Sequence, residues 1–396
     1  MPHPSSPSRS RVQISRRRLM AGGAATLGVW AAARLSPTAL GLADPEPGDT
    51  VVPFLDELPD PGGREQVKWH EPQPWITPTQ HVFTVGHYSR PAEIDPAAYR
   101  LEVFGQFDKP ATLTLDQVKA LPRKELTATL ECSGNGSNPS FMGAIGNATW
   151  AGTPLVGLLK EWGLQKPAVE VAFYGADTGT EKLAGGDVEQ PFARTLPIGE
   201  TGREDILLCY EMNGLPLPHE HGAPLRLAVP GWYGIAWVKW LTGIEARDRR
   251  LMTRFIARDY VTVRGEMHDG KTLWRQTSVG PINVKSITAR VVRRPDGTHV
   301  VHGVAWTQGK VAKVEVKVDD GEWAEAKLQE NQTPHTWTFW SYDWKQPAGG
   351  EHRIVSRATD DRGRVQPTAD DPEIKLKKTY WEAYAQYPRR VRIKSS

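Results

Sequence analysis

The chain has 396 residues, of which 24% are charged, and its formal net charge at pH 7 is +3. This length exceeds one usual hydrophobic core and predicts two domains. So small a net charge excludes the broad basic surface with which proteins bind nucleic acid, so no nucleic-acid partner is expected.

The first 43 residues have the features of an export signal. The basic stretch SRRRLM (residues 15–20) is followed by an uncharged run (19–33) and by small residues, Gly41–Ala43. These three features indicate a signal peptide, and the paired arginines indicate the twin-arginine route. The uncharged run is shorter than the roughly 20 apolar residues of a membrane span. We therefore expect residues 1–43 to be a twin-arginine signal peptide and the mature protein to be periplasmic or secreted.

The positive charge belongs to this leader. Residues 1–43 contain six arginines and no acidic residue, so the rest of the chain carries 43 basic and 46 acidic side chains, a net charge of −3. A slightly acidic surface favours solubility and an encounter with a basic partner.

Residues 44–80 are rich in proline and acidic residues, as in DPEPGDT, LPDPGG and EPQPWITP. Proline interrupts helices and cannot donate a hydrogen bond within a central strand. We therefore expect an extended arm that wraps the first domain.

Residues 81–279 combine short strand patterns, short helices and long loops. The segment YRLEVFG (99–105) alternates with a period of two and predicts a strand, whereas TLDQVKAL (114–121) begins with a capping threonine and predicts a helix. TPLVGLLKEWGL predicts a helix closed by Gly163, and APLRLAVPGW predicts a buried strand. Mixed short elements of this kind indicate an α+β domain.

The pattern changes near Gly280, where several alternating strands follow one another between turn signals. In VAKVEVKVDDG, the valines at 314, 316 and 318 face one way and the charged residues between them face the other, and Asp320-Gly321 predicts a hairpin turn. Strands at this regular spacing predict an all-β, immunoglobulin-like sandwich over residues 280–396.

The two cysteines have different surroundings. Cys209 lies in the apolar run DILLCYEMNG and is expected to be a small buried hydrophobe, although an exported protein could also pair it with Cys132 in a disulfide. Neither cysteine belongs to a Cys-x-x-Cys-His motif or to a group with zinc-binding spacing, so neither c-type haem nor zinc is expected in this chain.

Cys132 follows the strand-like stretch LTATLE and opens the glycine-rich loop CSGNGSNP. Free backbone N–H groups in such a loop favour the thiolate, which is the reactive and metal-binding form. Three roles stay open: a nucleophile with a histidine base, a ligand to a soft metal, or a structural residue. The small neighbouring residues let a large group approach and favour the ligand. The loop lacks the third glycine and the following helix of a dinucleotide-binding motif.

Cationic and imidazole side chains recur in the loops of the first domain. They are His87, Arg90, His219, His221, Arg226 and Lys239. Each could be a surface or capping residue, and the histidine pair could suggest zinc, but no third ligand lies at a usual spacing. Grouped around one thiol, these side chains better fit a phosphate-bearing cofactor.

These motifs resemble the sulfite oxidase family of molybdenum enzymes over nearly all of the mature sequence. LECSGN is similar to the family's cysteine loop, and the run from Cys209 to Leu241, CYEMNGLPLPHEHGAPLRLAVPGWYGIAWVKWL, is similar to its most recognisable segment. ITPTQHVFTVGHY resembles an early pterin-contacting segment, and the strand-rich end resembles the dimerisation domain. The resemblance thus implies an α+β molybdopterin-binding domain over residues 81–279, followed by an immunoglobulin-like dimerisation domain.

The resemblance also implies a molybdenum–molybdopterin cofactor with Cys132 as its protein sulfur ligand. Tyr260, in ARDY, matches the family's active-site tyrosine. The residues that would hold the pterin and its phosphate are Phe83, Thr84, Val85, Gly86, His87, Asp177, His221, Arg226, Trp237, Val238 and Lys239. Cationic side chains neutralise a phosphate, and the groups around a metal's ligands orient them.

The chain departs from the pattern of sulfite-oxidising members at positions that bear on the substrate. Val85, Ser137 and Ala236 stand where those members usually have arginine, and Gly86 stands in place of an asparagine. A dianion such as sulfite should therefore bind more weakly unless other cations replace the arginines. The candidate replacements are Arg90, Arg194 and His219.

The expected function is oxygen-atom transfer on sulfite or a related sulfur compound, with electrons passed to an external acceptor, plausibly a c-type cytochrome. A sulfane dehydrogenase-like subunit and another sulfur or sulfoxide oxidoreductase are alternatives, although exported sulfoxide reductases usually lack the sandwich. From different classes, a cysteine hydrolase or a non-catalytic binding protein stays in play. A homodimer is expected from the resemblance alone.

Overall fold

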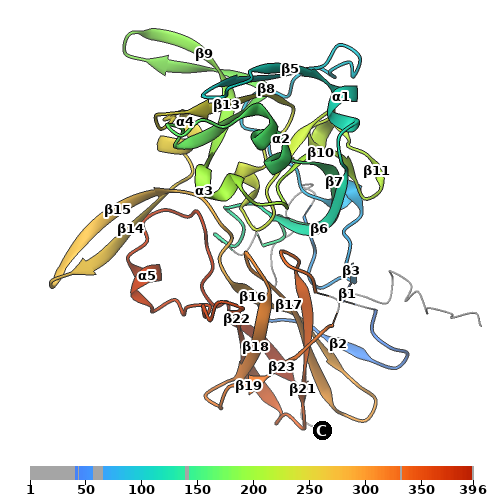
Figure 1. Ribbon diagram of the computed structural model, residues 1–396. Coiled ribbons are helices and arrows are strands. Elements are labelled where there is room, and N and C mark those ends of the chain that lie inside the picture. Colours follow the sequence, from blue (N-terminus) through green and yellow to red (C-terminus); the bar gives the residue numbers. More distant parts are fainter. Residues whose placement is uncertain (1–40, 43, 57–65, 139–141, 331, 395–396) are drawn as a thin grey trace, which may run out of the picture. The chain divides into compact units, whose positions relative to one another are not determined.

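The computed structural model describes residues 41–42, 44–56, 66–138, 142–330 and 332–394 (Figure 1). One sheet of the first domain carries the cysteine loop and has the strand order β11-β10-β7-β6, with β12 paired to β10. Its strands are β6 (Lys124–Glu131), β7 (Ile145–Pro154), β10 (Leu207–Met212), β11 (Leu215–Pro216) and β12 (Arg226–Ala228).

A second sheet of the same domain has the order β5-β4-β13-β8-β9, in which only β4 and β13 run parallel. Its strands are β4 (Arg100–Gly105), β5 (Ala111–Thr114), β8 (Glu170–Leu183), β9 (Gly186–Pro197) and β13 (Leu241–Arg247). The α-helices around the two sheets are α1 (Leu115–Lys119), α2 (Leu155–Trp162), α3 (Ile198–Thr201) and α4 (Arg254–Ala257). The 3₁₀ helices are η2 (Thr79–His81), η3 (His219–His221) and η4 (Gly234–Ala236).

Local sequence signals account for the ends of the two main helices. Thr114 accepts a hydrogen bond from the backbone N–H of Gln117, whose side chain returns to the N–H of Thr114, so the predicted cap is a complete capping box. Helix α2 ends at Gly163, whose φ of 72° is one that glycine adopts without strain. Both helix predictions are confirmed, as are the strands predicted in YRLEVFG and APLRLAVPGW.

The carboxy-terminal part forms two facing sheets, drawn in orange to red in Figure 1. One sheet contains β2 (Thr50–Val52), β16 (Lys285–Arg293), β17 (His299–Trp306), β21 (Thr338–Trp344) and β20 (Lys327–Leu328). The other contains β19 (Ala324–Glu325), β18 (Val311–Val318), β22 (Gly350–Asp360) and β23 (Arg389–Ile393). Val314 and Val316 are fully buried, as their alternation predicts. The predicted fold class, an α+β domain followed by an immunoglobulin-like sandwich, is confirmed.

Two further elements join or flank these domains. The hairpin of β14 (Val261–His268) and β15 (Lys271–Ser278) forms a two-stranded sheet of its own, and α5 (Pro372–Lys375) lies near it (Figure 1). Over the described ranges, no helix is long and apolar enough to cross a membrane.

The arm does not follow the expectation that it wraps the first domain. Its strand β2 pairs with β16, and Phe54 bridges to Val391, so this part completes the sandwich as an edge strand. Farther along, the backbone of Val67 bonds to Gly143 of the first domain. The expectation was wrong for residues 50–54 because an unpaired sandwich edge offers backbone partners that proline content cannot reveal.

The leader lies almost wholly outside the described residues. Gly41 and Leu42 are described, and as β1 they pair with β3 (Gln73–Pro74) and are buried. The side-chain amide of Gln329, in the sandwich, also bonds to both backbone groups of Gly41. The predicted boundary at residue 43 therefore falls after a short strand that packs on the folded protein.

Candidate functional site

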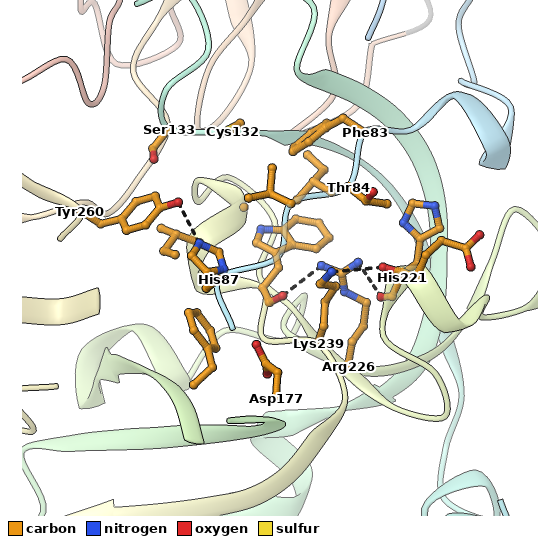
Figure 2. A pocket seen from close by; sticks show the side chains of 17 residues that line it. Phe83, Thr84, His87, Cys132, Ser133, Asp177, His221, Arg226, Lys239 and Tyr260 are labelled. Carbon is orange, nitrogen blue, oxygen red and sulfur yellow. Dashed lines mark hydrogen bonds between the residues drawn. The ribbon is translucent and has the colours of Figure 1, made fainter. Parts of the chain in front are cut away.

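One cavity gathers most of the predicted site residues. Those that line it are Phe83, Thr84, Val85, His87, Cys132, Asp177, His221, Arg226, Trp237, Lys239 and Tyr260. Figure 2 shows Cys132 and Ser133 on one side of the view, with Asp177, Lys239 and Arg226 opposite them. Two predicted residues do not line it: Val238 is buried behind the wall, and Gly86 faces an adjoining hollow.

Several side chains that line the cavity come from strand ends or from an irregularity within a strand. Cys132 directly follows β6, and Arg226 begins β12. Asp177 lies where the pairing of β8 with β9 shifts register between Tyr174 and Thr178. A bulge of this kind re-aims a side chain out of its strand's alternation, which places the carboxylate in the cavity.

The thiol of Cys132 is largely buried. Burial raises the pKa of the Cys132 thiol to about 11, although backbone N–H groups of Gly134 and Asn135 and the charge of Lys285 oppose that shift. Both cysteines are free, and Cys209 is fully buried and donates its thiol hydrogen to the carbonyl of Glu211. The prediction that Cys209 is a small buried residue is confirmed.

The surroundings of Cys132 do not suit a cysteine nucleophile. A thiolate nucleophile needs a base within hydrogen-bonding reach or a lowered pKa. Within the described part of the chain, no histidine is hydrogen bonded to this thiol, and its pKa is raised. That part also contains no cluster of three or more His, Cys, Asp or Glu side chains able to hold a metal. Among the described residues, a metal at Cys132 would therefore find no set of three such protein ligands, so a cofactor would have to supply ligands as well.

Arg226 is buried and held rigidly. Its terminal nitrogens donate to the backbone carbonyls of His221 (2.9 Å) and Trp237 (3.0 Å), as Figure 2 shows. Its guanidinium lies 5.1 Å from the ring centroid of Trp150 and 5.7 Å from that of Trp237. Burial lowers the pKa of Arg226 to about 10, so it remains a cation at neutral pH.

Lys239 adds a second, more labile charge. Its Nζ donates to the carbonyl of Glu220 at 3.2 Å, and burial together with Arg226 lowers its pKa to about 7. His221 Nε2 lies 3.2 Å from the Thr79 carbonyl and must donate to it, so the neutral ring presents Nδ1 as an acceptor. Burial, reinforced by Arg226, lowers the pKa of His221 to about 4 and keeps that ring neutral.

The residues present fit a cofactor that combines an anion with N–H donors. Three residues that line the cavity each have a buried polar atom without a hydrogen-bond partner: Ser133 Oγ, Asp177 Oδ1 and Arg226 Nε. Buried polar atoms are nearly always paired, so such atoms call for a polar ligand. Arg226 and Lys239 suit a phosphate, and the carboxylate of Asp177, whose pKa burial raises to about 6, suits the N–H groups of a pterin.

Tyr260 and His87 form a bonded pair on the same side as the thiol. The Tyr260 hydroxyl lies 2.8 Å from His87 Nε2 (Figure 2). Burial and the charges of Lys239 and Arg194 lower the pKa of His87 to about 3, while burial raises that of Tyr260 far above neutrality. Both groups therefore remain neutral over the physiological range.

The backbone at Tyr260 is strained. Its φ is 56°, a conformation that is rare for a bulky residue and costs about 1–3 kcal/mol. The Tyr260 carbonyl accepts a hydrogen bond from the N–H of Val279, and the ring stacks on Trp381 with centroids 4.1 Å apart. Strain maintained by such contacts is typical of functional sites.

None of the three candidate replacements for the missing arginines lines the cavity itself. Arg90 lines an adjoining hollow that also reaches Cys132 and Tyr260. Arg194 is buried, and its terminal nitrogens donate to the carbonyls of Phe255 and Val279. His219 bonds to the carbonyl of Pro91. Of the three candidate replacements, only Arg90 faces a space next to the thiol.

Several lining residues were not predicted. They are Leu130, Ser133, Phe192, Glu220, Gly234 and Ile235. Ser133 and Glu220 are direct neighbours of predicted residues, and Leu130 and Ile235 lie two positions from one, so chain proximity could have indicated these four. Phe192 is different, because it comes from β9 and stacks on His87 with ring centroids 4.8 Å apart. No local motif marks such a contact between distant segments.

Comparisons with known proteins agree with this geometry. A model described as the oxidoreductase molybdopterin binding domain matches residues 87–255, and one described as the Mo-co oxidoreductase dimerisation domain matches residues 277–382. Mitochondrial sulfite oxidase of Homo sapiens is 34% identical over 326 residues, covering 75% of this chain and 58% of that protein. The enzyme of Drosophila melanogaster is 32% identical over 328 residues, covering 74% and 55%.

A solved structure extends the comparison. The sulfane dehydrogenase SoxCD from Paracoccus pantotrophus matches with a TM-score of 0.69 and 25% identity, over 87% of this chain and 91% of that chain. The fold and the site define a molybdopterin-binding oxidoreductase with a dimerisation domain. The chain belongs to the sulfite oxidase family, as its motifs predicted. It spans somewhat more than half the length of the two sulfite oxidases named above.

Lys239 should make the cofactor-free protein less stable at neutral pH. Its folded pKa of about 7 lies below its unfolded value, so the unfolded chain binds more protons between pH 7 and 10 and stability rises with pH in that window. In cofactor-free protein, Lys239→Met should raise the free energy of unfolding at pH 7 by about 1–3 kcal/mol, and by less at pH 10. Denaturant unfolding at both pH values measures this difference.

The matched control is Lys160→Met, an exposed change on α2, which should have no such effect. With cofactor bound, the sign should reverse, because the variant loses a cation that faces the phosphate. A cofactor-free Lys239→Met protein that is less stable than wild type at pH 7 contradicts this account.

Removal of the Tyr260 hydroxyl should lower the rate without a new pH dependence. Tyr260→Phe should reduce kcat about tenfold to a hundredfold at unchanged cofactor content, since one positioned polar group is lost. Because His87 and Tyr260 do not titrate between pH 5 and 9, the ratio of wild-type to variant activity should be constant over that range. Tyr380→Phe, at an exposed neighbour, is the control. If the ratio of wild-type to variant activity changes with pH between 5 and 9, the account of a neutral His87–Tyr260 pair is contradicted.

Proposed function

We propose that this enzyme oxidises sulfite or a related sulfur compound, with Cys132 as the protein ligand of a molybdenum–molybdopterin cofactor. The observation that carries the proposal is one cavity with a thiol on one side and, opposite it, two cationic side chains and a buried carboxylate with one unpaired oxygen. Few ligands need all three features at once, and a phosphorylated pterin that carries a thiol-seeking metal does.

The chain's own residues would each have a distinct task. When bound, the cofactor supplies two-electron oxygen-atom transfer. Arg226 and Lys239 would neutralise its phosphate, and Asp177 would accept hydrogen bonds from its N–H groups. Because burial raises the pKa of the Cys132 thiol, ligation would release its proton, and the Gly134 and Asn135 N–H groups would then stabilise the thiolate. Tyr260, held by His87, would position the substrate beside the thiol.

Two substrates are candidates: sulfite and a compound that contains sulfane sulfur. With Val85, Ser137 and Ala236 in place of arginine, and only Arg90 facing the adjoining hollow, a dianion meets less positive charge than three arginines would provide. Sulfite remains the first candidate because the two relatives named above, from Homo sapiens and Drosophila melanogaster, are sulfite oxidases. A sulfane-sulfur substrate is the second, supported by the likeness to SoxCD over 91% of that chain.

The acceptor and the cellular location are further parts of the proposal. Electrons would leave to a separate redox protein such as a c-type cytochrome, and a net charge of −3 without the leader favours a basic one. The twin-arginine motif supports export to the periplasm. The dimerisation domain supports a homodimer.

Replacement of the ligand tests the function most simply. Wild-type protein matured with sufficient molybdenum should contain about one molybdenum atom per chain, and sulfite or a sulfane-sulfur donor should produce a molybdenum(V) electron paramagnetic resonance signal. Cys132→Ser should lose at least about 99% of turnover, because the thiolate is the metal's one protein ligand. Cys209→Ser is the matched control and should retain activity. Fully matured protein that contains no molybdenum would contradict the proposal.

The location has its own test. Arg16→Lys together with Arg17→Lys should leave most of the protein inside the cell, because paired arginines are read by the export machinery. Cell fractionation followed by immunoblotting measures the distribution. Arg9→Lys with Arg11→Lys keeps the pair and should be exported normally. Equal export of both double variants contradicts the twin-arginine route.

A further inference from the structure

A buried ion pair joins the two domains directly beside Cys132. Glu131 is the last residue of β6, and Lys285 is the first residue of β16 in the sandwich. Lys285 Nζ lies 2.6 Å from Glu131 Oε1, and the two side chains are 4% and 0% exposed. The pair thus connects the strand that leads into the cysteine loop with the domain matched by the dimerisation model.

Neighbouring groups complete the hydrogen bonding of this pair. Trp306, the cross-strand partner of Lys285, donates its indole N–H to Glu131 Oε2 at 2.8 Å. The Asn135 side-chain amide donates to Glu131 Oε1 at 3.0 Å, and Lys285 Nζ also donates to the Asn135 carbonyl at 3.0 Å. Both carboxylate oxygens are therefore satisfied by partners that approach from two domains.

These contacts hold the turn that contains the thiol. Cys132 donates its backbone N–H to the carbonyl of Ala144, and its own carbonyl accepts from the N–H of Asn135, both at 2.9 Å. The Asn135 side-chain oxygen accepts from the N–H of Ala144 at 3.0 Å. Because Glu131 and Asn135 flank the turn and Lys285 bonds to both, the pair fixes the turn at its two ends.

The sandwich domain approaches the same turn from a second direction. The backbone N–H of Glu382 donates to the Ser133 carbonyl at 2.7 Å, and Trp381 stacks on Tyr260. The Glu382 side chain is held in turn by the Thr262 hydroxyl at 2.5 Å. The turn that begins at Cys132 and the Tyr260 ring are thus both contacted by residues that lie outside the molybdopterin-binding domain.

Stability alone does not account for a buried ion pair in this place. Desolvation of two charges offsets most of their attraction, and replacement by apolar residues of similar volume is often neutral or stabilising. We propose that Glu131, Lys285 and Asn135 are positioning residues, which hold the Cys132 sulfur in its place in the cavity wall. The domain matched as a dimerisation domain therefore also positions the metal-binding thiol.

The inference rests on the proposed role of Cys132, and its test has two readouts. The first is the rate at which iodoacetamide modifies Cys132 in the cofactor-free full chain, with the site identified by mass spectrometry. The second is the molybdenum(V) electron paramagnetic resonance spectrum of the loaded protein after reduction with dithionite. The variants are Lys285→Met, Lys285→Arg and the double change Glu131→Met with Lys285→Met.

Lys285→Met and the double variant should both react at least about tenfold faster than wild type, which corresponds to about 1.4 kcal/mol of lost local protection. Both should also shift the molybdenum(V) g values, and Lys285→Arg should restore part of each property. The double variant leaves no unpaired buried charge, so it keeps the test decisive if Lys285→Met fails to fold.

The matched control is Arg389→Met, which breaks the pair of Arg389 with Asp56 (2.9 Å) within the sandwich. It should lower the melting temperature but leave the reaction rate and the spectrum unchanged. A double variant with wild-type values for both readouts overturns the positioning role. Wild-type protein without a molybdenum(V) signal instead overturns the proposed function, and the iodoacetamide rates still decide whether the pair holds the loop.

Discussion

The site depends on holding one thiol in a cavity wall while two cations are held in the wall opposite. The side chains in both walls are held in fixed positions. Arg226 is fixed by two backbone carbonyls and flanked by two indole rings. The turn that begins at Cys132 is fixed to the backbone of Ala144 by the Cys132 N–H and the Asn135 side-chain oxygen. A rigid ligand can bind to both walls at once only if both are already in place. The buried polar contacts behind each wall therefore serve to preorganise the site.

Burial sets the chemistry of the site as much as residue type does. It raises the pKa of Cys132 and Asp177 and lowers that of His87, His221 and Lys239. Without a cofactor, Cys132, His87 and His221 are therefore neutral at pH 7, and Lys239 is only partly protonated. Arg226 and most of Asp177 stay charged. A bound cofactor with an anionic end and a cationic metal would draw both Lys239 and Cys132 toward their charged forms. The cavity is therefore suited to a ligand that brings its own charges.

Local patterns in the sequence predicted much of the fold. The strand alternation around Val314, the capping box at Thr114 and the stop at Gly163 each depend on a few adjacent residues, and each is present. Motif resemblance predicted the site residues, and most of them line one cavity. The departures at Val85, Ser137 and Ala236 could be read only against that resemblance.

What could not be predicted involves partners far apart in the chain. Lys285 begins a strand and has the sequence context of a surface lysine, yet it pairs with a carboxylate 154 residues earlier. Phe192 reaches His87 across the domain, and β2 joins the sandwich although its composition suggests only an extended arm. The left-handed backbone conformation of Tyr260 could not be predicted from the sequence either, because tertiary contacts impose it.

The central claim is a bond between the Cys132 sulfur and the metal. Molybdenum K-edge X-ray absorption on the loaded protein counts the sulfur atoms around the metal in wild type and in Cys132→Ser. The account predicts one sulfur neighbour fewer in the variant, with the other sulfur neighbours retained. An equal number of sulfur neighbours in the two proteins would contradict it.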